Sequence, residues 1–393
     1  MLHFPRRTAA RMVPLISTLF LLAVVTLAGC ELGEYKARAV GKEGEVIVVI
    51  DSSRWNGPIG DALKSTVGEY IGTLPAPERR FDLRAMDLQV DQDLSQVRNQ
   101  KNVIFVAPLS DTTNEATYLR NVFDASAQEA IMSGDGVVVG RNDLWRRDQR
   151  VFYITGQDTD AVVDAIDRRA GEITRTFDDA TRQRMTEDMF DKGRQIDIEE
   201  YLMSEHDFAV NVQHDYLIAI DTTNFVWLRR ILSDTWRSLF IWYDERANPA
   251  VLTPEWIYAT RDSLTREYIQ GNLGGWAEIH RHELRPLLSE NIDFLGHYGF
   301  ETRGVWRMVG EQDGEFVEFG GGGPFVNYTF YDRASGRIYM IDGMVFAPGY
   351  EKREFLRQME VIAHTFRTAH EQDIETPIEA ASETETETGA ETE

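Results

Sequence analysis

The sequence predicts an α+β protein: an N-terminal α/β domain followed by an antiparallel sheet domain with flanking helices, in an α-β-α sandwich-like arrangement. Three observations support this fold class. A chain of 393 residues is long for one hydrophobic core. Its 42% hydrophobic and 11% aromatic content is typical of a globular protein. Strand and helix patterns alternate in the first half, whereas several strands follow one another in the second.

The first half begins with a buried strand, because residues 45–50 (Glu-Val-Ile-Val-Val-Ile) form a β-branched run. A helix follows, with Pro58 at its first position. Further strands are predicted at residues 81–88, 102–107, 136–140 and 151–155, and helices at 116–130 and 158–192.

The second half contains three consecutive strands and then an inserted helix, which is the pattern of an antiparallel sheet. These strands are expected at residues 216–220, 225–231 and 238–243, later strands at 299–309, 325–331 and 337–346, and helices at 253–268 and 351–366. The last helix has Phe355, Met359, Ile362 and Phe366 at a spacing that predicts one buried stripe. A short helix is expected at residues 198–204.

These elements give a domain division with a boundary near the polar segment that follows the long helix. It comprises a signal peptide (1–29), a tether (30–44), the α/β domain (45–192), a linker (193–207), the α+β domain (208–368) and an acidic tail (369–393). Residues 371–393 contain nine acids and no Lys or Arg. This composition predicts a disordered tail.

The N-terminus predicts a bacterial lipoprotein signal. Arg6, Arg7 and Arg11 precede an uncharged stretch that ends in Leu27-Ala28-Gly29-Cys30. This ending resembles the box in which the cysteine takes a lipid and becomes the new N-terminus. We therefore expect Cys30, the only cysteine, to be acylated and to hold the protein in membrane lipid at the cell envelope. Glu31 favours the outer membrane, because the retention signal of enteric bacteria is aspartate.

Two alternatives to lipidation are weaker. An uncleaved anchor needs an apolar span of about 20 residues, and the stretch from Val13 to Ala28 is shorter. Ordinary secretion would leave one free thiol exposed.

The charge of the chain excludes nucleic acid as a partner. The net charge is −24, and loss of the three signal-peptide arginines makes the mature chain −27. Such a surface repels phosphates. The cations comprise 35 arginines and only 6 lysines. An acidic, lysine-poor chain is typical of a salt-loving organism, and GC-rich codon usage is the alternative explanation.

Five segments carry a resemblance to a known family: Trp55-Asn56-Gly57, residues 224–229 (Asn-Phe-Val-Trp-Leu-Arg), residues 301–306 (Glu-Thr-Arg-Gly-Val-Trp), residues 323–328 (Gly-Pro-Phe-Val-Asn-Tyr) and residues 343–348 (Gly-Met-Val-Phe-Ala-Pro). They resemble uncharacterised Bacteroidota envelope lipoproteins that share a domain of unknown function, DUF4837. The resemblance runs from about residue 41 to about residue 367. It implies an envelope lipoprotein and assigns no catalytic residue. The second half also resembles Mog1/PsbP-type folds, whose members are mostly binding or assembly factors.

The candidate contacts for a ligand or partner are arginines that share strands with tryptophans: Arg229, Arg303, Arg307, Trp227 and Trp306. Arginine beside indole can bind carboxylate, phosphate or sugar. The alternative is that the tryptophans fill the core and the arginines pair with acids. Trp306 and Arg303 are expected on opposite strand faces.

Two other patterns are weak. His280 and His282, with Glu278 or His297, have the residue types of a metal site, but we predict neither a metal nor a cofactor. The run from Gly320 to Pro324 lacks the ending of a phosphate loop. It is interpreted as a flexible connection, or alternatively as a mobile lid.

No catalytic motif is recognisable, so the sequence favours a non-enzymatic binding or assembly factor. The alternative is an envelope hydrolase or glycan-active enzyme whose site forms only in three dimensions. A deep pocket with perturbed pKa values would favour the enzyme, and a shallow groove or an exposed aromatic patch would favour the binding module.

Overall fold

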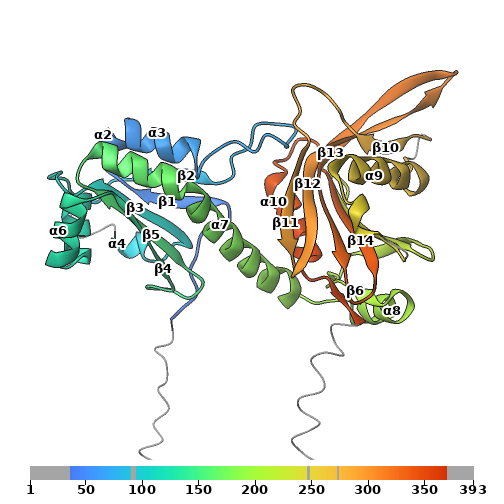
Figure 1. Cartoon of the computed structure of the whole chain (residues 1–393), viewed down its shortest axis with the longest axis horizontal. Coiled ribbons are helices and arrows are strands. Elements are labelled where there is room, and N and C mark those ends of the chain that lie inside the picture. The colour runs from blue at the N-terminus through green and yellow to red at the C-terminus, as the bar shows by residue number, and fades with distance from the viewer. Residues whose placement is uncertain (1–35, 90–93, 246–247, 272–273, 370–393) are drawn as a thin grey trace, which may run out of the picture.

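The computed structural model describes residues 36–89, 94–245, 248–271 and 274–369. Two lobes with separate sheets are joined by the long helix α7 (Thr159–Asp191), which runs from the first lobe into the second in Figure 1. An N-terminal α/β sheet followed by an antiparallel sheet domain is the fold class that the sequence predicted. No helix in the described ranges combines the length and apolarity needed to cross a membrane.

The first sheet has the strand order β2-β1-β3-β5-β4, with β4 antiparallel and the others parallel. Its strands are β1 (Glu45–Val49), β2 (Asp82–Met86), β3 (Asn102–Pro108), β4 (Val137–Asn142) and β5 (Arg150–Gly156). All seven residues of β3 are buried. A central parallel strand requires this, because helices cover both faces of such a sheet.

Helices α3 (Pro58–Ser65) and α7 cover one face of this sheet, and α5 (Asn114–Val122) and α6 (Ala125–Ser133) cover the other. Short helices α2 (Ser52–Trp55) and α4 (Leu94–Val97) complete the domain. The single helix expected at residues 116–130 is therefore two helices. The Asp124 side chain caps the second by accepting from the Ala127 backbone N–H, which starts a new helix there.

The second sheet has the order β10-β12-β13-β14-β9-β8-β7, with β11 also paired to β12, and all its pairs are antiparallel. Its strands are β7 (Leu217–Asp221), β8 (Phe225–Ile231), β9 (Trp236–Asp244), β10 (Trp276–Ile279), β11 (Leu288–Phe294), β12 (His297–Gln312), β13 (Glu315–Asp332) and β14 (Arg337–Phe346). Strands β10 and β11 were not predicted from the sequence. Strand β6 (Phe208–Ala209) pairs with β15 (Arg367–Thr368), and a 3-10 turn, η1, spans Pro249–Val251.

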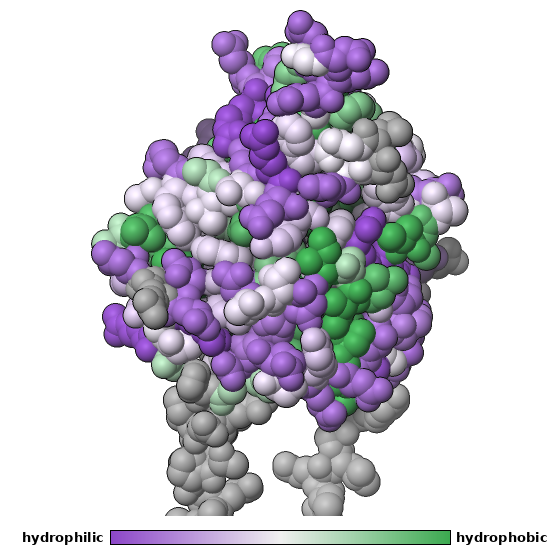
Figure 2. Space-filling model, turned by 90° about the vertical axis from the view of Figure 1, so that its right-hand side faces the viewer, coloured by the Kyte–Doolittle hydropathy of each residue, from purple (hydrophilic) through white to green (hydrophobic). Residues whose placement is uncertain are grey.

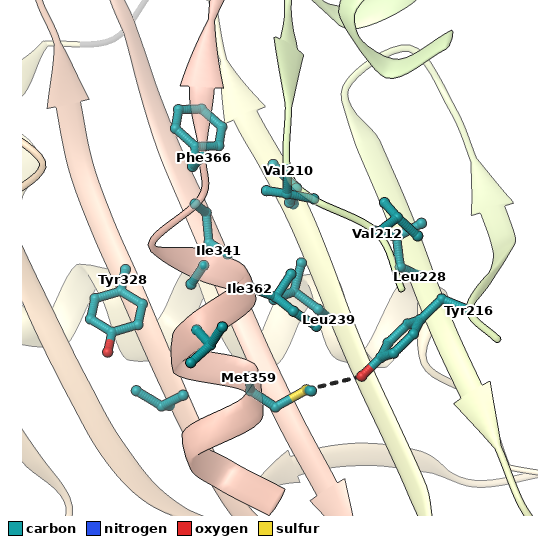
Figure 3. Packing of buried hydrophobic residues seen from close by; sticks show 14 of the residues in the cluster. Val210, Val212, Tyr216, Leu228, Leu239, Tyr328, Ile341, Met359, Ile362 and Phe366 are labelled. Atoms are coloured by element: carbon teal, nitrogen blue, oxygen red, sulfur yellow. Dashed lines mark hydrogen bonds between the residues drawn. The ribbon is translucent and has the colours of Figure 1, made fainter. Parts of the chain in front are cut away.

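Helices α10 (Arg353–Ala363) and α8 (Ile196–His206) lie on one face of the second sheet, and α9 (Pro254–Tyr268) lies on the other. Figure 3 shows Met359 and Ile362 of α10 directed at the strands, with the Tyr216 hydroxyl 4.0 Å from the Met359 sulfur. Leu202 of α8 is buried in the same cluster. The segment expected to be a linker therefore contains a helix that packs into this core.

The predicted stripe on the last helix is partly wrong. Phe355 is only half-buried and packs at the margin of the core, with the Arg237 guanidinium 5.0 Å above its ring, whereas Leu356 is fully inside the core. Met185 and Met189 of α7 also belong to this cluster. The end of α7 thus connects the two lobes through apolar packing.

Helix α9 is fixed to the sheet by an ion pair that is fully removed from solvent. The Arg261 Nε lies 2.7 Å from an Asp342 oxygen, and both side chains have 0% exposure. The Asn327 amide also donates to Asp342, and the Phe325 ring lies 3.8 Å below the Arg261 guanidinium. Loss of either charge would leave the other buried without a partner.

The glycine run is not a flexible connection. Residues 320–324 lie inside β13, where Gly322 pairs with Arg307 and Gly323 with Trp306. A Cβ atom on Gly323 would lie 1.9 Å from the Val345 carbonyl oxygen, and one on Gly322 would lie 2.6 Å from the Trp306 oxygen. Glycine is required here because neighbouring backbones approach closely.

We predict that Gly323→Ala destabilises the protein by about 1–3 kcal/mol or more, because the new methyl group meets backbone. The matched change Gly321→Ala meets only the Met308 side chain, at 3.1 Å, and is expected to stay within about 0.5 kcal/mol of wild type. Denaturant unfolding measures both. Equal stability of the two variants would contradict the close approach.

Candidate functional site

A groove between the two lobes has a volume of about 690 Å³. The first lobe contributes residues 69–74 and one side of α7 to its lining, and the second contributes β11, β12 and α10. This size is typical of sites for small ligands or short peptide segments.

Arg303 of β12 lies at the base of the groove between two carboxylates. Its Nε is 2.5 Å from Glu301, two residues away on the same strand face, and its Nη1 is 2.6 Å from Glu360 of α10. Burial alone would lower the pKa of Arg303, but the two carboxylates raise it well above its usual value. Burial would likewise raise the pKa of Glu301, and Arg303 lowers it overall. Arg303 and Glu301 are therefore both ionised at neutral pH.

Tyr328 and His364 extend this cluster. Burial, together with the charges of Glu301 and Glu360, raises the pKa of Tyr328 well above that of a free phenol. Burial, together with Arg182, lowers the pKa of His364. His364 Nδ1 lies 2.8 Å from the Glu360 carbonyl and Nε2 lies 2.7 Å from Arg182 Nη1. Because arginine can only donate, Nε2 accepts and the imidazole is the neutral Nδ1–H tautomer.

The first lobe closes the groove with further ion pairs. Asp178 of α7 lies 3.1 Å from Arg80 and 3.3 Å from Arg357 of α10. Burial raises the pKa of Asp178, although both arginines act in the opposite direction. Arg357 also donates to the Arg80 carbonyl at 2.9 Å, so α10 is fixed to the first lobe here.

Five aliphatic side chains also line the groove, namely Ile71, Leu74, Leu288, Ile292 and Leu356, together with further polar groups that include Glu290. The groove thus combines aliphatic side chains with the paired charges around Arg303 and Asp178, whereas Glu290 has no ion pair among the described residues. Such a surface can bind a ligand through burial and directional hydrogen bonds. Proton transfer would require a free acid or base, and the carboxylates of Glu301 and Glu360 are bonded to Arg303.

The structure separates the five residues that the sequence singled out, and Arg303 is the one that lines the groove. Trp227 and Trp306 are buried against α9, so Trp306 and Arg303 lie on opposite faces of the sheet. Arg229 stacks on Trp227 at 4.4 Å. Arg307 pairs with Glu278 at 2.8 Å and with Glu318 at 3.2 Å.

The histidines do not assemble with the proposed carboxylate. His280 and His282 lie 6.0 Å apart in a second, open cavity of about 530 Å³, but Glu278 is engaged by Arg307. His297 stacks on Phe330. Within the described ranges, no three His, Cys, Asp or Glu residues are grouped closely enough to hold a metal ion. Cys30 and the acidic tail lie outside the described residues.

Sequence reasoning missed most of the groove, including Glu301, Tyr328, Glu360, His364 and Arg182. One signal was available, because Glu301 and Arg303 are two apart on a strand and therefore share a face.

The outer side of the second lobe is mostly hydrophilic in Figure 2, with one hydrophobic patch. Exposed apolar side chains of this lobe include Leu217, Ile231 and Leu232.

The fold and the groove define a two-domain protein with a cleft between its domains. Residues 195–365 match the family described as Domain of unknown function (DUF4837), which confirms the domain named from the sequence. Residues 39–190 match a separate family, Domain of unknown function (DUF8532), so the first resemblance is confined to the second domain. No curated protein matches the chain.

Solved structures that resemble part of the chain include two of Mog1. One is the Saccharomyces cerevisiae Ran-binding protein Mog1p, at 9% identity and a TM-score of 0.27, and the other is a mutant of protein Mog1, at 9% identity and a TM-score of 0.26. Each match covers 42% of this chain, and 90% and 91% of the respective Mog1 chains. The Mog1 likeness expected for the second half is confirmed, at values that carry no argument about function.

We predict that His364 makes the groove sensitive to acid. Because its pKa is lowered in the folded state, the unfolded chain takes up a proton more readily as the pH falls below the ordinary value of 6.5. The protein should therefore lose stability from about pH 7.5 to about pH 5.5. His364→Gln should reduce this loss, whereas the exposed control His214→Gln should not. Thermal melts at both pH values measure the loss of stability in the wild type and in the two variants. Identical pH dependence in all three proteins would contradict the prediction.

Proposed function

We propose that this protein is a lipid-anchored component of the cell envelope that binds a partner protein or ligand in the groove between its domains, without transforming it chemically. The observation that carries the binding role is the groove itself. Arg303 at its base is matched with Glu301 and Glu360, and aliphatic side chains form part of the surrounding lining. This is the composition of a recognition surface.

The envelope location rests on the sequence of the N-terminus. Leu27-Ala28-Gly29-Cys30 follows a basic start and an apolar stretch. Acyl chains on Cys30 would contribute about 0.8 kcal/mol per buried CH₂, and more than one chain gives lasting attachment. Glu31 favours the outer membrane. The excess of acids over a lysine-poor cation set supports adaptation to high salt.

An envelope hydrolase or glycan-active enzyme is the second candidate. The perturbed pKa values of Tyr328 and His364 in one cavity favour it. The bonding of the groove favours the first candidate, because Arg182 donates to His364 Nε2 and Arg303 binds both nearby carboxylates. An active site would need at least one of these groups free to move a proton.

The anchoring proposal is tested with Cys30→Ser. The hydroxyl does not form the thioether, so this variant should incorporate no labelled fatty acid and should leave the detergent phase, or remain uncleaved at this site. The wild-type chain is the control. Processing at the same residue, with retention in the detergent phase, would show that the lipoprotein assignment is wrong.

The groove proposal is tested with Leu288→Glu, which places a charge on the aliphatic part of the lining at a side chain that is 48% exposed. Leu232→Glu is the matched control, at 44% exposure and outside the groove lining. We expect the groove variant to lose partners that copurify with wild type from solubilised envelopes, and the control to keep them. Loss from both variants or from neither would place binding elsewhere.

A further inference from the structure

We infer that β11 is a docking strand: an extended segment of a partner protein adds to its free edge and so becomes a further strand of the second sheet. This inference rests on the proposed role of the groove and specifies how the groove binds. Main-chain hydrogen bonds would supply affinity, and alternate side chains would supply specificity.

The outer edge of β11 is open. The strand pairs with β12 over its whole length, from Leu288↔Arg303 to Phe294↔His297, without a register shift. The turn residues Leu295 and Gly296 have φ of 54° and 84°, as a two-residue type I′ hairpin requires.

This turn determines which backbone groups point outward. In such a hairpin Phe294 and His297 form a hydrogen-bonded pair. The backbone groups of every second residue before Phe294, which are Ile292, Glu290 and Leu288, therefore also bond to β12. The N–H and C=O groups of Ser289, Asn291 and Asp293 therefore point away from β12. In the described part of the chain, no other strand pairs with them.

The other edges of this sheet are less suitable. Strand β7 has a register shift between Ile218 and Ile220, which interrupts the row of outward groups. Strand β10 has only four residues. Strand β11 has seven, and it borders the groove.

The side chains of β11 define the chemistry of the added strand. Leu288, Glu290 and Ile292 line the groove at alternate positions. Glu290 lies directly opposite Glu301 on β12, and like charges opposite each other are destabilising. Arg303 neutralises Glu301, whereas Glu290 has no ion pair among the described residues. The matching segment therefore has an apolar residue, a basic residue and a second apolar residue at alternate positions.

This charge also argues for a partner rather than for the chain itself. The C-terminal residues 371–393 contain nine acids and no Lys or Arg. Such a segment would be repelled by Glu290 and Asp293. A basic, extended segment of another protein matches both the open edge and the unpaired carboxylate.

The test uses the seven-residue peptide Thr-Val-Thr-Lys-Thr-Val-Thr and an otherwise identical peptide with Gln in place of Lys. Binding to the mature chain is measured by calorimetry. We expect the lysine peptide to bind more tightly than the glutamine peptide. In Glu290→Gln the two peptides should bind equally, because the charge that distinguishes them is gone.

The backbone bonds are tested with Asn291→Pro, which removes one outward N–H and leaves the β12 bonds in place. Asn291→Ala, which keeps that N–H, is the control. We expect the proline variant to bind the lysine peptide roughly tenfold more weakly than the alanine variant. Equal binding by the two variants would overturn strand addition, as would the absence of saturable binding to wild type.

Two further outcomes identify other occupants. Dimerisation of the wild type that Asn291→Pro abolishes, measured by sedimentation, would show that a second copy occupies the edge and would overturn the proposal. An envelope partner that Leu288→Glu loses but Asn291→Pro retains would show that the groove binds without strand addition. The proposed function would then stand although this inference fails.

Discussion

The position of α10 depends on a cap that comes from the other lobe. Lys352, at the start of the helix, offers no capping side chain, and both Glu78 oxygens accept from its backbone N–H at 2.8 Å. Glu78 also accepts from the Arg353 N–H at 2.8 Å. Helix starts leave such donors without partners, and a carboxylate there is favoured by the helix dipole. Glu78 is separated from Lys352 by 274 positions in the sequence and from Arg353 by 275 positions. Because the cap joins such distant segments, it fixes one lobe against the other and so creates the groove.

The unusual preference for arginine over lysine has a use in this arrangement. Arg353 reaches Asp82 at 3.0 Å and the Arg79 carbonyl at 2.7 Å, and Arg303 binds two carboxylates at once. A planar guanidinium with five donors can satisfy several acceptors, and a lysine ammonium cannot match this geometry. The many carboxylates of the chain therefore find multidentate partners in the arginines at the contact between the lobes.

Most elements could be predicted because their apolar patterns are strong. Strands β1, β3 and β5 and helix α7 were found within a few residues of their observed bounds. Strand β11 was missed because it is a largely exposed edge, with polar residues on both faces. The glycine run was misinterpreted as flexible, because the close approach of Val345 to Gly323 is invisible in sequence. Phe355 fitted the helical stripe and packs against the core, but it is only partly buried, whereas the neighbouring Leu356 is buried in the core.

The sequence alone determined the fold class and the acidic composition, because composition and periodicity are local properties, and the prediction of lipidation at Cys30 also rests on the sequence. It also identified Arg303, but without the partners that give this residue its environment. The tertiary structure alone decided the groove. Tyr70, Arg182, Arg303 and His364 line one cavity only after α10 has docked on α7 and on the segment around Glu78. Contacts between residues so distant in the chain depend on how the lobes pack, and no local pattern encodes that packing.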